Sequence, residues 1–131
     1  MNEARLEQLL YRGESESLDF KRDQYPFAGA SNEQKSKLLK DILAMANSWR
    51  SGTAHILIGV DAPSGTLPQV IGLNQHIDDA SLQQFINSKT QRPVEFRYSE
   101  KEIRGKLIGV LEIPVQRRPL YAATALGGRP G

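Results

Sequence analysis

The fold of this 131-residue chain is decided by the stretch Gly13-Glu14-Ser15-Glu16-Ser17-Leu18-Asp19-Phe20-Lys21. Alternation at its end predicts a short strand over residues 18–21, with apolar side chains on one face and the charged side chains of Asp19 and Lys21 on the other. Further along, Ile56-Leu57-Ile58-Gly59-Val60-Asp61 predicts a second, apolar strand that ends in an acid. Charges on a strand face are either simply solvated or presented to a ligand, and both interpretations stay open at this point.

Hydrophobic periodicity predicts the rest of the secondary structure. Helices are expected over residues 3–11 and 33–48 and from about residue 79, and strands over residues 18–21, 54–60, 69–73, 94–99 and 107–113. The order of elements predicts an α+β fold: a single domain, residues 1–121, in which a mixed, largely antiparallel β-sheet is packed by about three helices. Because nearly every residue of 54–60 is apolar, that strand is typical of the centre of a sheet. Residues 122–131 are expected to form a flexible tail.

Composition is that of an ordinary globular domain, with 39% hydrophobic and 24% charged residues. No segment approaches the run of about 20 apolar residues that a membrane helix needs, and the N-terminus lacks the layout of a signal peptide. We therefore expect a cytoplasmic protein of bacterial type with no membrane partner. With no cysteine, the chain has neither a disulfide framework nor a thiolate metal site.

Common nucleotide-binding and triad motifs are absent from the sequence. It contains neither a GxxxxGK[ST] run nor a glycine-rich turn between a strand and a helix, so P-loop and dinucleotide sites are not supported. The two histidines, His55 and His76, are far apart and have no acidic partner at motif spacing. No nucleophile is singled out by such a pattern.

Basic residues are concentrated in the second half of the chain, although the net charge is only +2. Residues 1–61 hold 8 Lys and Arg against 9 Asp and Glu, whereas residues 62–131 hold 9 against 6. Such residues on a sheet and its hairpin either form a stripe that follows phosphates or are ordinary solvated strand ends.

Carboxylates are the remaining candidates for chemistry. Metal-dependent phosphodiester cleavage needs two or three acids that converge on a hard cation. Glu14, Glu16, Asp19 and Asp61 could supply them if the two strands are adjacent. Glu14 and Asp19 can converge only if the chain bends near residues 15–17, because side chains five apart point to opposite faces of a straight strand.

Several segments occur in an order that resembles a known family. After a helix come Gly-Glu-Ser-x-x-Leu-Asp-Phe-Lys (13–21), Ile42-Leu43-Ala44-Met45-Ala46-Asn47-Ser48, the second strand quoted above, Ile71-Gly72-Leu73, and Val110-Leu111-Glu112-Ile113-Pro114 followed by Arg118-Pro119-Leu120-Tyr121. From about Leu9 to Tyr121 the chain resembles the Schlafen/AlbA-like DNA-binding domain family. In bacteria such domains form the N-terminal part of predicted transcriptional regulators.

The resemblance also implies a candidate acidic trio. Some animal Schlafens cleave tRNA and rRNA with three acidic residues, which Glu14, Asp19 and Asp61 match by position. Asp19 stands where the family usually has glutamate, and the usual Asn-Ser/Thr-x-Gly-Gly turn is here a longer segment, residues 47–53, with one glycine. The ribonuclease members use two such lobes to clasp RNA, so a homodimer would have to supply the second lobe.

The favoured interpretation is a nucleic-acid-binding domain, for DNA or RNA, of a transcriptional regulator or defence protein. Its phosphate contacts are expected from Lys21, Arg22, Arg50, Arg97, Arg104 and Lys106. No cofactor is expected, and Glu14 would be a structural group bonded to the backbone near a strand turn. One alternative is a metal-dependent endoribonuclease with Glu14, Asp19 and Asp61 as catalytic residues and ligands of Mg²⁺ or Mn²⁺. The other is a protein-interaction or dimerisation domain.

Overall fold

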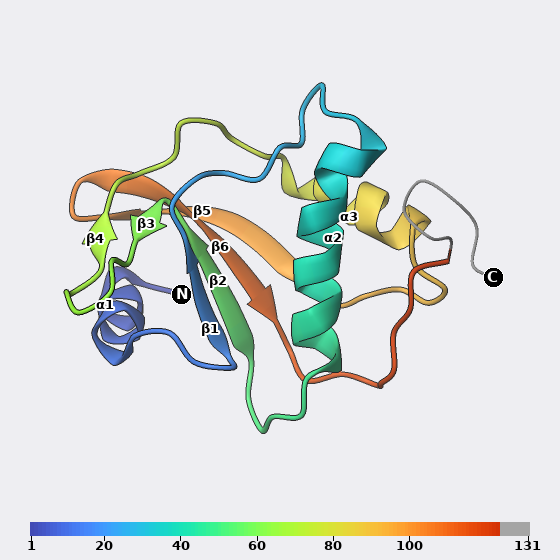
Figure 1. Cartoon of the computed structure of the whole chain (residues 1–131), viewed down its shortest axis with the longest axis horizontal. Coiled ribbons are helices and arrows are strands. Elements are labelled where there is room, and N and C mark those ends of the chain that lie inside the picture. Colours follow the sequence, from blue (N-terminus) through green and yellow to red (C-terminus); the bar gives the residue numbers. More distant parts are fainter. Residues whose placement is uncertain (124–131) are drawn as a thin grey trace.

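The computed structural model describes residues 1–123, and Figure 1 shows how the helices and strands are arranged. In chain order the elements are α1 (Glu3–Arg12), β1 (Leu18–Lys21), α2 (Asn32–Asn47), β2 (Ala54–Ile58), β3 (Val60–Asp61), β4 (Gln69–Val70), α3 (Asp79–Ser88), β5 (Arg97–Ile103) and β6 (Lys106–Ile113). This arrangement confirms the predicted α+β fold of a single domain with helices packed on a mixed sheet.

The main sheet has the strand order β1-β2-β6-β5. β1 runs parallel to β2, whereas β2 with β6 and β6 with β5 are antiparallel, so β1 and β5 form the two edges. Every residue of β2 is buried, which confirms the prediction of a central strand. The parallel register places Asp19 opposite Ile56 and Lys21 opposite Ile58.

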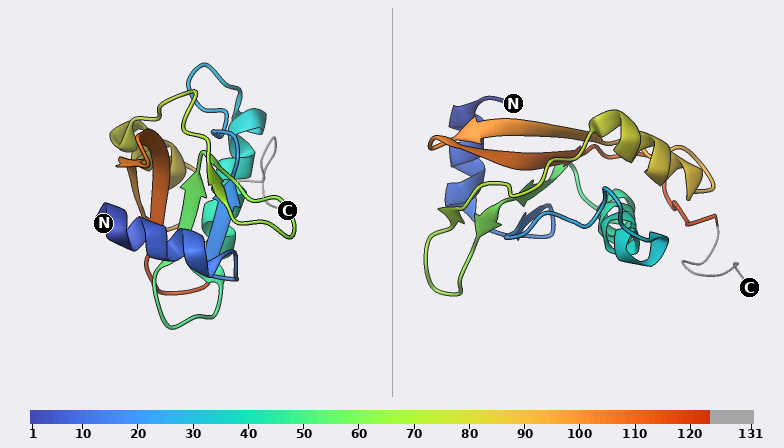
Figure 2. Two further views of the ribbon diagram at one scale, coloured as in Figure 1. Left: turned by 90° about the vertical axis from the view of Figure 1, so that its left-hand side faces the viewer. Right: turned by 90° about the horizontal axis from the view of Figure 1, so that it is seen from above.

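Helices cover both faces of this sheet. The buried leucines of α1, which are Leu6, Leu9 and Leu10, pack in a core with the apolar face of β1. Helices α2 and α3 supply the core on the other face. Figure 1 shows the sheet between α1 and α2, and in the left view of Figure 2 α1 crosses in front of the strands while α2 lies behind them. Among the described helices, none combines the length and apolar composition that crossing a bilayer requires.

The strand predicted over residues 54–60 is broken at Gly59, and the prediction of one continuous strand was wrong. Gly59 has a φ of +95°, and its carbonyl oxygen accepts hydrogen bonds from the backbone N–H groups of Ile71 at 2.8 Å and Gly72 at 3.0 Å. A Cβ at Gly59 would lie 2.9 Å from the carbonyl carbon of Gly72. The chain therefore leaves the main sheet here, and β3 pairs with β4 in a small sheet of its own.

The predicted strand 94–99 begins only at Arg97. Two preceding backbone donors are taken by side chains instead of a strand ladder. The N–H of Val94 donates to Asn87 Oδ1, and that of Glu95 to Gln116 Oε1, each at 2.8 Å. Val94 is nevertheless buried in the core, so its apolar character was informative and only its secondary structure was wrong.

The end of the domain extends slightly past the predicted boundary at residue 121. Ala122 forms a β-bridge with Thr90, and the N–H of Ala123 donates to the carbonyl of Lys89 at 2.7 Å. The rest of the predicted flexible tail, residues 124–131, lies outside the described residues.

Candidate functional site

Lys21 at the end of β1 lies between two carboxylates. Its Nζ is 3.0 Å from Asp19 Oδ2 and 3.7 Å from Asp41 Oδ2 on α2, and Tyr25 Oη donates to the same Asp41 oxygen at 2.6 Å. Partial burial lowers the pKa of Lys21, but its hydrogen bonds to the two carboxylates and their charges outweigh burial and raise it overall. The charged face of β1 is therefore directed at α2, and its lysine is already neutralised within the fold.

Glu14 folds back onto β1. A tight turn forms because the N–H of Ser15 donates to the carbonyl of Leu18 at 2.9 Å. Glu14 Oε2 then accepts a hydrogen bond from the backbone N–H of Phe20 at 2.9 Å. A hydrogen bond with the Asp19 carboxyl, together with desolvation, raises the pKa of Glu14. The bend that sequence analysis required is present, and it brings Glu14 beside Asp19.

Asp61, the third predicted acid, lies on another element. It pairs with Gln69 in the small sheet, beyond the bend at Gly59. Within residues 1–123, no group of three or more His, Asp or Glu side chains is placed to hold a metal ion. The carboxylate of Asp41 pairs with the same lysine, Lys21, as that of Asp19, and Asp41 was not among the predicted residues.

Arg50 uses all five of its N–H donors inside the fold. Nε donates to the carbonyl of Gly52 at 2.8 Å, and Nη1 donates to the carbonyl of Met45 and to Ser48 Oγ. Nη2 donates to the carbonyls of Ile113 at 2.6 Å and Pro114 at 3.2 Å. A guanidinium has no further donor to offer. This arginine therefore ties the loop after α2 to the end of β6.

Arg104 is also engaged within the domain. Its Nε and Nη2 donate to the two carboxylate oxygens of Glu7 at 3.0 and 2.8 Å, and its backbone N–H donates to Glu3 Oε2 at 3.1 Å. The side-chain hydrogen bond lowers the pKa of Glu7. The β5–β6 hairpin is thereby attached to α1.

The other predicted basic residues are more accessible. Lys106 Nζ approaches the carbonyl of Val70 at 3.4 Å. Arg22 and Arg97 are exposed, and within residues 1–123 neither forms an ion pair. Arg22 follows β1 and Arg97 begins β5, which are the opposite edges of the sheet. The six predicted residues therefore do not form one continuous stripe.

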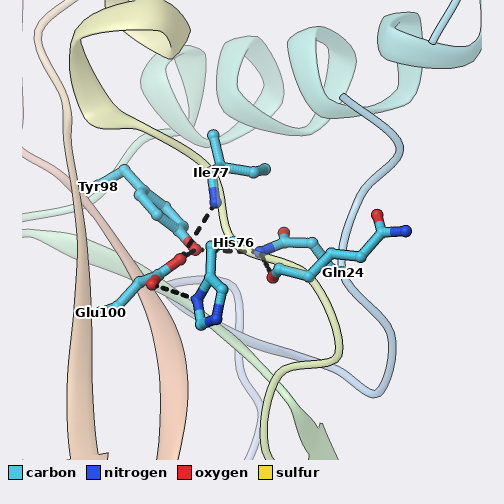
Figure 3. A network of polar contacts seen from close by, with 6 residues as sticks. Gln24, His76, Ile77, Tyr98 and Glu100 are labelled. Carbon is cyan, nitrogen blue, oxygen red and sulfur yellow. Dashed lines mark hydrogen bonds and ion pairs between the residues drawn. The ribbon is translucent and has the colours of Figure 1, made fainter. Parts of the chain in front are cut away.

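A polar network that sequence analysis missed links two loops to β5 (Figure 3). Glu100 accepts from Tyr98 Oη at 2.7 Å and from the backbone N–H of Ile77 at 3.1 Å, and His76 Nδ1 lies 2.7 Å from its other oxygen. Gln24 Nε2 donates to Tyr98 Oη at 3.0 Å. Burial raises the pKa of Glu100, but these hydrogen bonds outweigh it and lower the pKa overall. No local motif could reveal the partner of His76, because it is 24 residues away in sequence.

Comparison with known proteins identifies the family to which this protein belongs. Residues 14–128 match the family model described as Schlafen, AlbA_2. The chain therefore belongs to the Schlafen/AlbA_2 family, as the motifs in its sequence predicted. The match begins after α1, which the structure places on one face of the sheet.

Solved structures show the same fold at low sequence identity. One is the N-terminal domain of a protein related to the ATP-dependent DNA helicase RecG from Nitrosomonas europaea, with 18% identity and a TM-score of 0.63 over 100% of this chain and 86% of that one. Another is the DIP2311 protein from Corynebacterium diphtheriae, with 19% identity and a TM-score of 0.59 over 91% of this chain. The aligned part is 23% of the Corynebacterium chain. No curated protein matches the chain.

Proposed function

We propose that this domain binds nucleic acid through the phosphate backbone, as a module of a longer regulatory or defence protein. The observation that carries the proposal is a concentration of arginines near the start of β2. Arg5, Arg12 and Arg50 line a pocket of about 570 Å³ there, together with the acidic residue Glu16. Arg117 and Arg118 line a neighbouring pocket of about 380 Å³. An excess of positive charge gathered in adjacent hollows attracts phosphates.

The buried histidine in the first pocket responds to these charges. Burial lowers the pKa of His55, and although Glu112 opposes this, Arg5, Arg12 and Arg50 lower it further. The three arginines have this effect because their charges disfavour a further positive charge on the ring. The same charges favour an anion.

The surface extends toward one of the predicted basic residues. Thr53 lines the first of these pockets, which contains Arg5 and Arg12, and also a third pocket, which contains Arg97. We therefore assign the phosphate contacts to five arginines, and we call this set the arginine surface: Arg5, Arg12, Arg97, Arg117 and Arg118. Arg50 supports the surface from within, because its donors are used by the backbone. Three of the predicted residues, Lys21, Arg22 and Lys106, lie at the other end of the strands. Arg104 lines a further pocket with Arg5 and Arg12, but its guanidinium is paired with Glu7.

The test is fluorescence anisotropy with labelled duplex DNA and structured RNA at two salt concentrations. We expect saturable binding that weakens steeply with salt. The double variant Arg5→Gln, Arg12→Gln should lower the slope of log K against log salt by about 1 for each phosphate contact that is lost. Lys40→Gln on the exposed side of α2 is the matched control and should leave the slope unchanged. Absence of saturable binding to both polymers at low salt would reject the proposal and favour a protein-interaction domain.

One observation favours the second candidate, a metal-dependent endoribonuclease. Glu14 and Asp19 are close enough to share a hydrogen bond, as catalytic carboxylate pairs do. The fit to Mg²⁺ or Mn²⁺ is incomplete, because Asp61 lies on the small sheet and Lys21 already neutralises Asp19. The test is a denaturing gel of labelled RNA incubated with Mn²⁺. Cleavage that Asp19→Ala abolishes would support the nuclease, and intact RNA would reject it.

Similar proteins support the proposal that this domain is a nucleic-acid-binding module of a longer protein. Family membership and the fold shared with a RecG-related N-terminal domain support a nucleic-acid role. The domain corresponds to a small part of the Corynebacterium chain, which supports a role as one module among others. A homodimer that provides a second lobe for RNA stays a prediction, to be checked by sedimentation with and without nucleic acid.

A further inference from the structure

Trp49 is the single tryptophan of the chain and lies in the loop after α2, where it is 83% exposed. Tryptophan side chains contribute large apolar surfaces that are usually largely buried, so this exposure is unusual. Exposure alone is not evidence of a site, because Tyr11 on α1 is 84% exposed as well. Tyr11 also lines a pocket with Arg5 and Arg12, so what distinguishes Trp49 is the guanidinium of Arg118 beside its ring and its position between two pockets that contain arginines.

The indole ring is bordered by arginines on both sides. Trp49 lines the pocket that contains Arg5 and Arg12 and also the neighbouring pocket that contains Arg117 and Arg118. The guanidinium carbon of Arg118 lies 3.6 Å from the ring centroid. Since the residue is still 83% exposed, this contact leaves most of the ring open to a ligand.

The loop that carries Trp49 is held in place by its two arginine neighbours. The next residue, Arg50, ties the loop to the carbonyls of Met45, Gly52 and Ile113. Arg118 donates from Nη1 to the carbonyl of Ser48 at 2.8 Å. A ring presented on a loop fixed at these points loses less conformational entropy on binding than one on a mobile loop.

We infer that Trp49 is a stacking surface for an unpaired base, and that the arginines on either side of it bind the flanking phosphates. The preferred ligand is therefore single-stranded nucleic acid. Bases of a duplex present their faces to one another and only their edges to a protein, whereas every unpaired base offers a face to an aromatic ring. This inference rests on the proposed function, but it concerns the base rather than the phosphates.

The intrinsic fluorescence of Trp49 provides the test, because all tryptophan emission comes from this residue. The unmodified protein is titrated with a thymidine 12-mer, a uridine 12-mer and a 12-base-pair duplex at low salt. We expect saturable quenching by the single strands and little by the duplex. Comparison of the two 12-mers separates DNA from RNA as the preferred source of the unpaired base.

Variants of the exposed aromatic residues complete the experiment, with binding followed by anisotropy of labelled strands. Trp49→Ala should weaken binding of the single strands about 5- to 100-fold, and Trp49→Phe should restore part of the affinity because it keeps an aromatic face. Duplex affinity should be unchanged in both variants. Tyr121→Ala is the matched control: this ring is 58% exposed and lines neither pocket beside Trp49, so the variant should bind like the unmodified protein. Circular dichroism checks that each variant is folded.

The possible failures distinguish the two proposals. Equal quenching by the duplex, or unchanged single-strand affinity in Trp49→Ala, would overturn the stacking inference and leave phosphate binding in place. Absence of binding to every strand and duplex would overturn both.

Discussion

Glu14 shows how a single side chain can determine local structure at the start of β1. Its carboxylate accepts a hydrogen bond from the backbone N–H of Phe20 and also lies beside the carboxyl of Asp19. The first contact stabilises the turn, whereas the second places two acids together. A carboxyl with a raised pKa holds its proton more tightly in the folded state than in the unfolded state. Stability from this group is therefore present at low pH and is lost as pH rises from its ordinary value of 4.5 through the raised value.

We predict that Glu14→Gln is as stable as the unmodified protein at low pH and more stable at pH 7. The glutamine keeps an acceptor for Phe20 N–H and adds a donor for Asp19, without the second negative charge. The gain should be below about 1 kcal/mol, because both carboxyls are partly solvated. Urea unfolding at intervals between pH 4 and pH 8 measures it, with Glu16→Gln in the same turn as control. Lower stability of Glu14→Gln at pH 7 would contradict the shared hydrogen bond.

At the scale of elements, the decisive feature is the break between β2 and β3. An apolar run that could continue as one strand instead turns at Gly59 and starts a second sheet. The positive φ and the close approach of Gly72 both require a residue without a Cβ there. This break also places Asp61 in the small sheet and not in the strand that pairs with β1.

We predict that Gly59→Ala destabilises the domain by more than about 2 kcal/mol, because the methyl group meets backbone that cannot move independently. Gly65→Ala is the matched control: its φ is +80°, but no atom lies within 4 Å of the added Cβ. It should cost about 1 kcal/mol from backbone strain alone. Thermal and urea unfolding of both variants provide the comparison, and equal losses would show that contact with Gly72 is unimportant.

At the scale of the whole molecule, the sheet depends on apolar cover from both sides. The family match begins at residue 14, after α1, yet α1 buries three leucines against the sheet. Its attachment is reinforced where Arg104 in the β5–β6 hairpin binds Glu7. Helix α1 is therefore an integral part of this domain.

We predict that Leu9→Ala in α1 destabilises the domain by about 2–5 kcal/mol, as truncation of a fully buried leucine does in other cores. Leu39→Ala in α2, on the opposite face, should cost a similar amount, since the two side chains are 1% and 0% exposed. Denaturant unfolding followed by circular dichroism measures both. A loss below about 1 kcal/mol for Leu9→Ala alone would mean that α1 is detachable.

Short-range pattern in the sequence was enough to predict the class of fold, the order of the elements and the family. Periodicity over residues 33–48 and the apolar run at 54–60 are local signals, because packing faces are set by residues one or two turns apart. Even the proximity of Glu14 and Asp19 was predicted conditionally, since the bend that it needs lies between them. The break at Gly59 was missed because it depends on Gly72, which is distant in sequence.

The amino-acid sequence by itself therefore determined the α+β architecture and the residues from which a site could be built. Only the tertiary structure decided which of them are available. Arg50 and Arg104 have the chemistry of phosphate ligands in the sequence, but the fold directs their donors to backbone carbonyls and to Glu7. Conversely, Trp49 and Arg118 come together across the chain. The physical reason is that hydrogen bonds and stacking depend on distances of a few ångströms, which long-range packing sets.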